Sequence, residues 1–144
     1  MANTAPAILW ITNKKGARIF LSDSWYGLTG QTENEALEFG WLDAVHPDDI
    51  SYTKEVFFNS NQNRAAFTLD YRLRKADGSY AWVIDAARPH ISESGEHLGY
   101  IGSVFDITDR KNAELEREQL LQAISLKEAQ FRRIADANIE RLGI

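Results

Sequence analysis

The feature that most constrains the fold is a set of three β-prone segments joined by two tight turns in the second half of the chain. The first segment, Ala66 to Lys75, alternates between apolar and polar side chains, which is typical of a strand with one buried face. Asp77-Gly78 and Ser94-Gly95 are turn sequences, and they lead into segments Tyr80 to His90 and His97 to Ile107. We therefore predict three consecutive antiparallel strands.

The last two of these segments are largely apolar on both alternation faces. A strand with only one buried face would carry polar residues on the other, so we expect both faces of this part of the sheet to be covered. The cover is predicted to be a helix or a second copy of the chain. The candidate residues of this docking face are Trp82, Ile84, Ile101, Phe105 and Ile107.

The first half of the chain predicts a β-hairpin, with strands at residues 7–12 and 17–21, followed by short helices. Thr32 and Glu35 have the spacing of a capping box at a helix start. A proline suited to the first helical position opens a longer helix, which is predicted over Pro47 to Asn59.

The end of the chain is rich in charge and predicts one long helix over residues 109–136, where neither glycine nor proline occurs. Arg117 and Lys127 interrupt its heptad-like apolar stripe, so the pattern is that of an imperfect coiled coil. The apolar members of the stripe are Ala113, Leu120, Ile124, Phe131 and Ile134.

Charge and composition narrow the possible functions. A chain of 144 residues predicts one ordinary domain, and its formal net charge of -5 argues against binding to nucleic acid or to anionic lipid surfaces. Cysteine is absent, which excludes disulfides, thiolate metal sites and cysteine nucleophiles. The absence of cysteine favours a cytoplasmic setting. No apolar run approaches the length of a membrane span, so we expect no direct membrane insertion.

Several local motifs occur in one order along residues 7–111, and together they resemble those of the PAS domain, including its C-terminal PAC-type motif. The matching segments are Trp25-Tyr26-Gly27-Leu28-Thr29-Gly30, Trp41 to Asp49, Tyr71-Arg72-Leu73-Arg74 with Asp77-Gly78, Gly99-Tyr100-Ile101-Gly102, and Asp106 to Lys111. The resemblance implies an α+β fold: a five-stranded antiparallel sheet with helices on one face, enclosing a pocket used for small ligands or cofactors.

The resemblance also implies a domain organisation. A PAS sensory domain is expected at residues 5–108, a coiled-coil-like signalling helix at residues 109–136, and the start of a further module, such as a second PAS domain, at residues 137–144. Proteins of this kind include bacterial sensory histidine kinases of two-component systems and diguanylate cyclases, whose catalytic domain would lie outside this chain.

By resemblance, one set of residues would line the pocket between sheet and helices, although the same residues could equally form a packed core. Asp85 is a carboxylate on an otherwise apolar wall, so it is either a ligand contact or one partner of a buried hydrogen-bonded pair, and we favour the pair. The pocket candidates are Leu42, Val45, Phe57, Leu69, Tyr71, Leu73, Val83, Asp85 and Val104.

Candidate catalytic chemistry is weakly indicated. His46, Asp48 and Asp49 could form a metal site or an acid and base, but they stand at a predicted helix start, where capping explains all three. His90 and His97 flank a turn without the close ligand spacing of zinc sites, so we predict no metal site, no catalytic residue and no haem.

Two further ligand classes can be judged from the residues. A flavin that forms a cysteinyl adduct is excluded because the chain has no cysteine, and the identity of any other cofactor stays unknown. The pair Gly99 and Gly102 lies within a predicted strand, where it indicates close packing rather than nucleotide binding.

The predicted function is sensing and signal relay within a homodimer. Asp106 and Thr108 stand at the junction of last strand and helix, where Thr108 is expected to cap the helix and to pass on movements of the strand. One alternative is a ligand-free PAS module that serves only dimerisation and spacing, and another is a small enzyme built on the set around His46. The ligand, the output domain, the full-length architecture and the native start are not determined by these residues.

Overall fold

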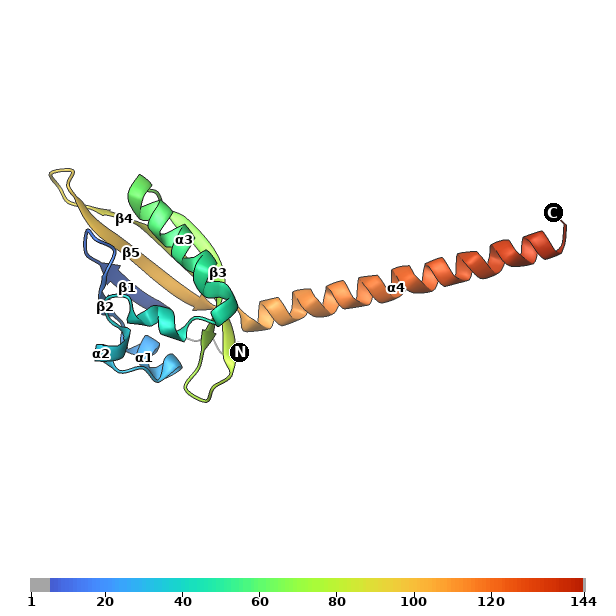
Figure 1. The fold of residues 1–144 in the computed structure, drawn as a ribbon, viewed down its shortest axis with the longest axis horizontal. Helices are drawn as coiled ribbons and strands as arrows, with labels where there is room; N and C mark the ends of the chain where they lie inside the picture. Colours follow the sequence, from blue (N-terminus) through green and yellow to red (C-terminus); the bar gives the residue numbers. More distant parts are fainter. Residues whose placement is uncertain (1–5, 144) are drawn as a thin grey trace. The chain divides into compact units, whose positions relative to one another are not determined.

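The computed structural model describes residues 6–143, and the chain divides into two compact units, one ending at Thr108 and the other beginning at Asp109. Ala5, where the predicted domain begins, and Ile144 lie outside the described residues. The first unit is an α+β domain in which a single sheet is covered by helices (Figure 1).

The sheet has five antiparallel strands in the order β2-β1-β5-β4-β3. The strand that comes last in the sequence, β5, therefore lies at the centre of the sheet. The predicted hairpin and the predicted three-stranded meander are both confirmed. The strands are β1 (Ile8–Thr12), β2 (Arg18–Leu21), β3 (Phe67–Arg74), β4 (Tyr80–Ile91) and β5 (His97–Asp106).

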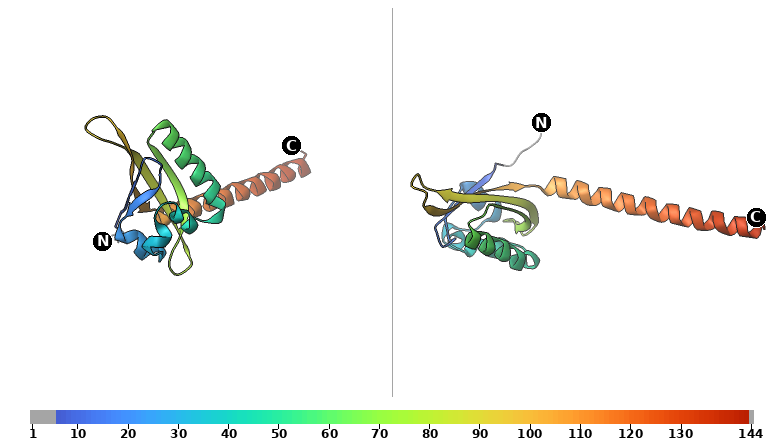
Figure 2. Two further views of the ribbon diagram at one scale, coloured as in Figure 1. Left: turned by 60° about the vertical axis from the view of Figure 1, so that its left-hand side comes forward. Right: turned by 90° about the horizontal axis from the view of Figure 1, so that it is seen from above.

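The helical segments lie between β2 and β3 in the chain, and α3 packs across the sheet on its inner face (Figure 2). The predicted capping box is confirmed: the Glu35 amide donates to Thr32 Oγ1 at 3.3 Å, and the Thr32 amide donates to Glu35 Oε1 at 3.0 Å. The helices are α1 (Asp23–Thr29), α2 (Glu33–Ala36), the 3-10 helix η1 (Gly40–Ala44) and α3 (Pro47–Asn63).

Helix α3 extends past Asn59, where the sequence pattern predicted its end. It ends at Asn63, and Arg64 follows in the left-handed conformation with φ 51°. A tertiary contact holds this last turn, because the Tyr100 hydroxyl lies 2.6 Å from the Ser60 carbonyl oxygen and 2.8 Å from that of Ala65. The predicted helix was too short because its polar final turn carries no apolar periodicity.

The core between sheet and helices is dominated by aromatic side chains. Trp10, Trp25 and Tyr71 are completely buried, and Trp41 is 1% exposed. Trp10 lies over Gly102 of the adjacent strand, where a Cβ atom would be only 2.2 Å from the indole ring. The close packing predicted from the glycine pair in β5 is therefore confirmed at this position.

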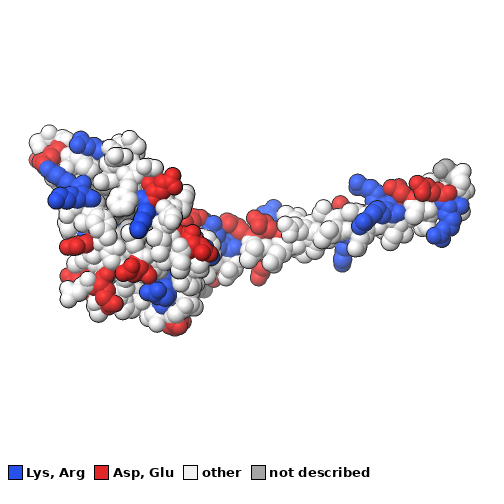
Figure 3. All heavy atoms as spheres, viewed as in Figure 1, with Lys and Arg blue, Asp and Glu red and all other residues white. Residues whose placement is uncertain are grey.

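The second unit is formed by α4 (Thr108–Arg141) from its second residue onward; this helix has 34 residues and begins one residue before the predicted start. None of its side chains is buried; Leu120 is 63% and Phe131 is 75% exposed. Its residues 119–126 carry no charge, which leaves a white band along the helix in Figure 3. Residues 137–141 belong to the same helix, and a further module beyond it stays a prediction.

Candidate functional site

The residues predicted to line a pocket all lie in the interior of the first unit. Eight of them belong to one continuous apolar core, in which Leu42 is the most exposed at 8%. The ninth, Asp85, is 1% exposed and lies against this core through its hydrogen bonds. The structure therefore brings the whole predicted set together, between the sheet and the helical layer.

At the centre of this interior is a charged residue that the sequence reasoning missed. Arg18 of β2 is 1% exposed, and its guanidinium carbon lies 4.1 Å from the ring centroid of Trp10 and 3.7 Å from that of Trp41. Trp25 contributes a third indole, at 5.9 Å. The guanidinium thus lies between aromatic faces, whose negative potential attracts a cation.

Asp85 of β4 is the counter-charge of this arrangement. Its carboxylate accepts hydrogen bonds from Trp10 Nε1 at 2.8 Å, from the Tyr71 hydroxyl at 2.9 Å and from Arg18 Nη2 at 3.4 Å. The prediction of a buried hydrogen-bonded pair is confirmed. We call Arg18, Asp85, Trp10, Trp41 and Tyr71 the Arg18 cage.

Burial sets the protonation behaviour of this cage. Desolvation raises the pKa of Asp85, while Arg18 and the hydrogen bonds from Trp10 and Tyr71 act in the opposite direction. Desolvation, together with the neighbouring carboxylate, also raises the pKa of Tyr71 well above its usual value. Tyr71 consequently remains a hydrogen-bond donor throughout the physiological pH range.

Part of the hydrogen-bonding capacity of the cage is unused within the described residues. Arg18 Nε, Arg18 Nη1 and Trp41 Nε1 are buried donors for which no described residue supplies an acceptor.

One sequence signal pointed to Arg18: it is the only charged residue in the two strands of the predicted first hairpin. Its partner Asp85 is 67 residues away, so no local pattern could join them.

The set around His46 lies at the start of α3, and the predicted capping role is confirmed for His46. His46 Nδ1 accepts from the Asp48 amide at 3.1 Å, and Asp48 is largely exposed. Asp49 instead holds Arg72 of β3, accepting from its backbone amide at 2.9 Å and from Nε and Nη2 at 3.0 and 2.8 Å. The Arg72 guanidinium lowers the pKa of Asp49. These contacts tie α3 to the sheet.

The other histidines flank the β4–β5 turn. His90 pairs with Gly99 across the hairpin, and the His97 ring lies 5.7 Å from that of Tyr100. Among residues 6–143, no group of three or more histidine, aspartate or glutamate side chains has an arrangement that could hold a metal ion.

The predicted junction has a different geometry from the one expected. Thr108 is the first helical residue rather than the cap, and Asp106 Oδ1 accepts from its amide at 2.9 Å and from its hydroxyl at 2.6 Å. The Thr108 hydroxyl also accepts from the Trp82 amide at 3.0 Å, and the Ile107 amide donates to the Trp82 carbonyl. The junction is therefore bonded to β4 as well as to β5.

Four of the five predicted docking-face residues lie on the outer face of the sheet. Phe105 is 47% exposed, and Trp82, Ile84 and Ile101 are half-buried. Ile107 differs from these four in being only 9% exposed, and its backbone amide is bonded to the Trp82 carbonyl oxygen; its place on the outer face stays a prediction. The structure adds Leu9 of β1, which is 51% exposed on the same face.

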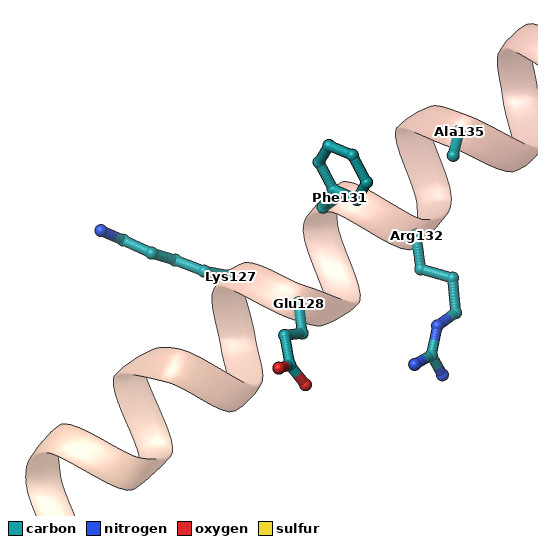
Figure 4. A pocket seen from close by; sticks show the side chains of 5 residues that line it. All are labelled: Lys127, Glu128, Phe131, Arg132 and Ala135. Carbon is teal, nitrogen blue, oxygen red and sulfur yellow. The ribbon is translucent and has the colours of Figure 1, made fainter.

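A shallow hollow on this outer face is lined by residues of three neighbouring strands, namely Leu9, Ala86, Ala87, Arg88, Ile101, Gly102 and Ser103. A second hollow lies on α4 alone, bounded by Lys127, Glu128, Phe131, Arg132 and Ala135 (Figure 4). All five of its side chains come from one helix, so it is open to solvent, and Phe131 would need another element to cover it.

Within the described residues, none of the helices combines the length and the apolar character that crossing a membrane requires.

Comparison with known proteins places the fold among sensors. The chain is 43% identical over 117 residues to the uncharacterized protein y4lL of Sinorhizobium fredii, which covers 81% of this chain and 14% of that protein. It is 33% identical over 89 residues to a methyl sulfide methyltransferase-associated sensor of Methanosarcina acetivorans, covering 59% of this chain and 9% of the sensor. This chain therefore spans only a small part of these relatives.

Solved structures show the same arrangement. The N-terminal domain of a diguanylate cyclase with PAS/PAC sensor from Marinobacter aquaeolei matches with a TM-score of 0.65 and 25% identity, over 74% of this chain and 99% of that one. A sensory box histidine kinase/response regulator from Burkholderia thailandensis matches with a TM-score of 0.61 and 28% identity, over 82% of this chain and 92% of that one.

The family model described as PAS fold matches residues 18–104, which contain Arg18, Asp85 and most of the sheet. Together with the five-stranded sheet, the helical layer on its inner face and the relatives in sensor proteins, this match shows that the chain belongs to the PAS family of sensory signalling modules.

Proposed function

We propose that this PAS module acts as a homodimer that passes changes in its sheet to an output domain through α4. The output domain, a histidine kinase or a diguanylate cyclase, would lie outside this chain. The observation that carries the proposal is the position of Thr108, whose hydroxyl contacts the β4 backbone and the β5 carboxylate at the first residue of the helix.

The hydrogen bonds at the junction support a relay. Asp106 fixes the first turn of α4, and the Trp82 backbone both donates to the Thr108 hydroxyl and accepts from the Ile107 amide. A shift of β4 relative to β5 must therefore break these bonds or move the start of the helix. Interior and helix are linked through the same strand, because Asp85 is also in β4.

The exposed apolar residues of α4 support dimerisation. A single helix in water with Leu120, Ile124 and Phe131 exposed gains free energy when it buries them against another helix. The uncharged stretch at residues 119–126 offers no like-charge repulsion to a second copy. A cytoplasmic setting is part of this proposal, since a chain without cysteine has no need of an oxidising compartment.

The alternative of a ligand-free dimerisation and spacer module is favoured by one specific observation. The space between the Trp10 and Trp41 rings is filled by the protein's own Arg18 side chain. Native mass spectrometry of the purified chain separates the two functions, since a sensor of small molecules retains or gains a ligand mass and a spacer shows the protein mass alone.

The dimer is tested with charged substitutions in α4. Leu120→Glu with Ile124→Glu is expected to convert a dimer mass into a monomer mass, because two carboxylates would be buried at the seam. Gln122→Glu is the matched control, since it adds a carboxylate to the opposite side of the same helix turn and should leave the dimer intact. A monomeric wild-type chain would contradict the proposal.

The relay is tested at Thr108. Thr108→Val removes the hydroxyl that contacts β4 and β5, and it is expected to speed amide hydrogen exchange at Trp82 and in the first turn of α4. Thr108→Ser keeps the hydroxyl and is expected to restore protection. Equal protection in all three proteins would show that the junction does not couple strand and helix.

A further inference from the structure

The Arg18 cage has the composition of a binding site for a cation. Stacked indole faces and a carboxylate are the groups with which proteins bind cationic ligands, and here two indoles lie about the guanidinium while Asp85 lies 3.4 Å from Nη2. We propose that Trp10, Trp41 and Asp85 form a binding site for a planar guanidinium-type cation, which Arg18 occupies as an internal ligand.

Core stability alone gives no reason for this charge. Burying an ion pair costs desolvation energy, and apolar residues of the same volume are often as stabilising or more so. Arg18 and Asp85 are both about 1% exposed, so the full desolvation cost applies to each. A cation is therefore held here in a site whose chemistry selects for it.

Arg18 occupies the site imperfectly. Only one of its nitrogens, Nη2, bonds to Asp85, and the contact is long at 3.4 Å, whereas charge-assisted pairs are usually below about 3 Å. Its Nε and Nη1 atoms have no acceptor among the described residues. Because Arg18 is attached to the backbone of β2, its guanidinium approaches Asp85 from a fixed direction. A free guanidinium has no such attachment and is able to turn two nitrogens toward the carboxylate.

The strand that carries Arg18 is the part of the sheet best suited to move. β2 has only four residues, is one of the two edge strands and pairs with β1 alone in the sheet. Beyond β1, the Arg18 backbone pairs with Glu38 through bonds of 2.9 and 2.8 Å, and Glu38 holds the left-handed φ of 61° that disfavours non-glycine residues. Withdrawal of β2 would open the cage to a ligand bearing a guanidinium or amidinium group.

The inference goes beyond the proposed relay, since it concerns what the domain binds rather than how α4 responds. Its test uses the whole chain with Arg18→Ala, which removes the internal ligand but keeps both indoles and Asp85. The probe is methylguanidinium at millimolar concentration, well below the denaturing range of guanidinium salts. Methylurea is the matched control, because it is planar and of similar size but uncharged.

We expect methylguanidinium to raise the Tm of Arg18→Ala by about 5 °C at roughly ten times its Kd, and methylurea to have no such effect. Wild type, where a free cation must first displace Arg18, should respond far less than Arg18→Ala, and Arg18→Met, where an apolar chain fills the site, should not respond. The added substitution Asp85→Asn should abolish the response of Arg18→Ala by removing the counter-charge.

If Arg18→Ala does not fold by itself, methylguanidinium is expected to restore native tryptophan fluorescence. This recovery would support the proposal in the same way as the rise in Tm. Three outcomes would overturn the proposal: no recovery or Tm shift, an equal effect of methylurea, or an undiminished effect after Asp85→Asn. None of these readouts depends on dimerisation, so failure here leaves the relay through α4 unaffected.

Discussion

Trp10 lies directly over Gly102, its neighbour across the β1–β5 pair, at a distance that leaves room for a hydrogen atom and nothing larger. The ring cannot easily move, because its Nε1 atom is bonded to Asp85 at 2.8 Å. The glycine in β5 and the carboxylate in β4 therefore together fix the position of the indole that faces Arg18.

Gly102→Ala is accordingly expected to be strongly destabilising. Its Cβ would lie 2.2 Å from the indole carbons, so the sheet or the ring must shift at a cost of about 1–3 kcal/mol or more. Thermal unfolding measures this as a Tm loss. Gly27→Ala in α1 is the control: apart from its chain neighbours and the backbone of its own helix, no described atom lies within 4 Å of the added Cβ, and the substitution is expected to raise the free energy of unfolding by about 0.5–1 kcal/mol. Equal effects at the two glycines would contradict this account.

Asp49→Asn is expected to cost about 1–2 kcal/mol at neutral pH, because Arg72 loses its charged acceptor while remaining partly exposed. The folded pKa of Asp49 is lowered, so its contribution is present above the unfolded pKa of about 3.9 and is lost as pH falls through the folded value. The free energies of unfolding of variant and wild type, measured by urea unfolding, should therefore become more alike below about pH 4. Asp48→Asn, at an exposed position, should show little of either effect.

His97 is expected to make the domain less stable in mild acid. Burial lowers its pKa, as do the nearby positive charges of Arg64 and Lys14, the latter paired with Glu96. The unfolded chain then takes up a proton first, so stability falls as pH drops below about 6.5 and levels off below the folded pKa.

His97→Gln should flatten this part of the pH profile, measured by the free energy of unfolding. Arg64→Gln should reduce the slope in part, because it removes one of the positive charges that oppose protonation. A slope that persists unchanged in His97→Gln would assign the pH dependence to another group.

Tyr100→Phe is expected to loosen the end of α3. Its hydroxyl is bonded to two backbone oxygens, those of Ser60 and Ala65, and leaving them without this donor costs about 1–3 kcal/mol. Faster exchange of the Ala65 amide, which is itself bonded to the Ser60 oxygen, would report the local change. Tyr52→Phe, at a residue that is 55% exposed, should leave both stability and exchange nearly unchanged.

The order of elements could be predicted from the sequence because each depends on local signals. The strands of the meander are predicted by alternating apolar and polar side chains, and its turns by Asp77-Gly78 and Ser94-Gly95. The capping box of Thr32 and Glu35 is a contact within one helical turn. The apolar outer face could also be predicted, because successive side chains of β4 and β5 point to opposite faces of the sheet and both sets are largely apolar.

Contacts between distant residues were decided only by the tertiary structure. The last turn of α3 depends on Tyr100, and the junction after β5 depends on the backbone bond from Ile107 to Trp82 of β4. The sequence determined that Asp85 needed a partner, since a buried carboxylate must be compensated; which partner it has was decided by the fold. Arg18 meets it across 67 residues through sheet order, a relation that no periodic pattern encodes.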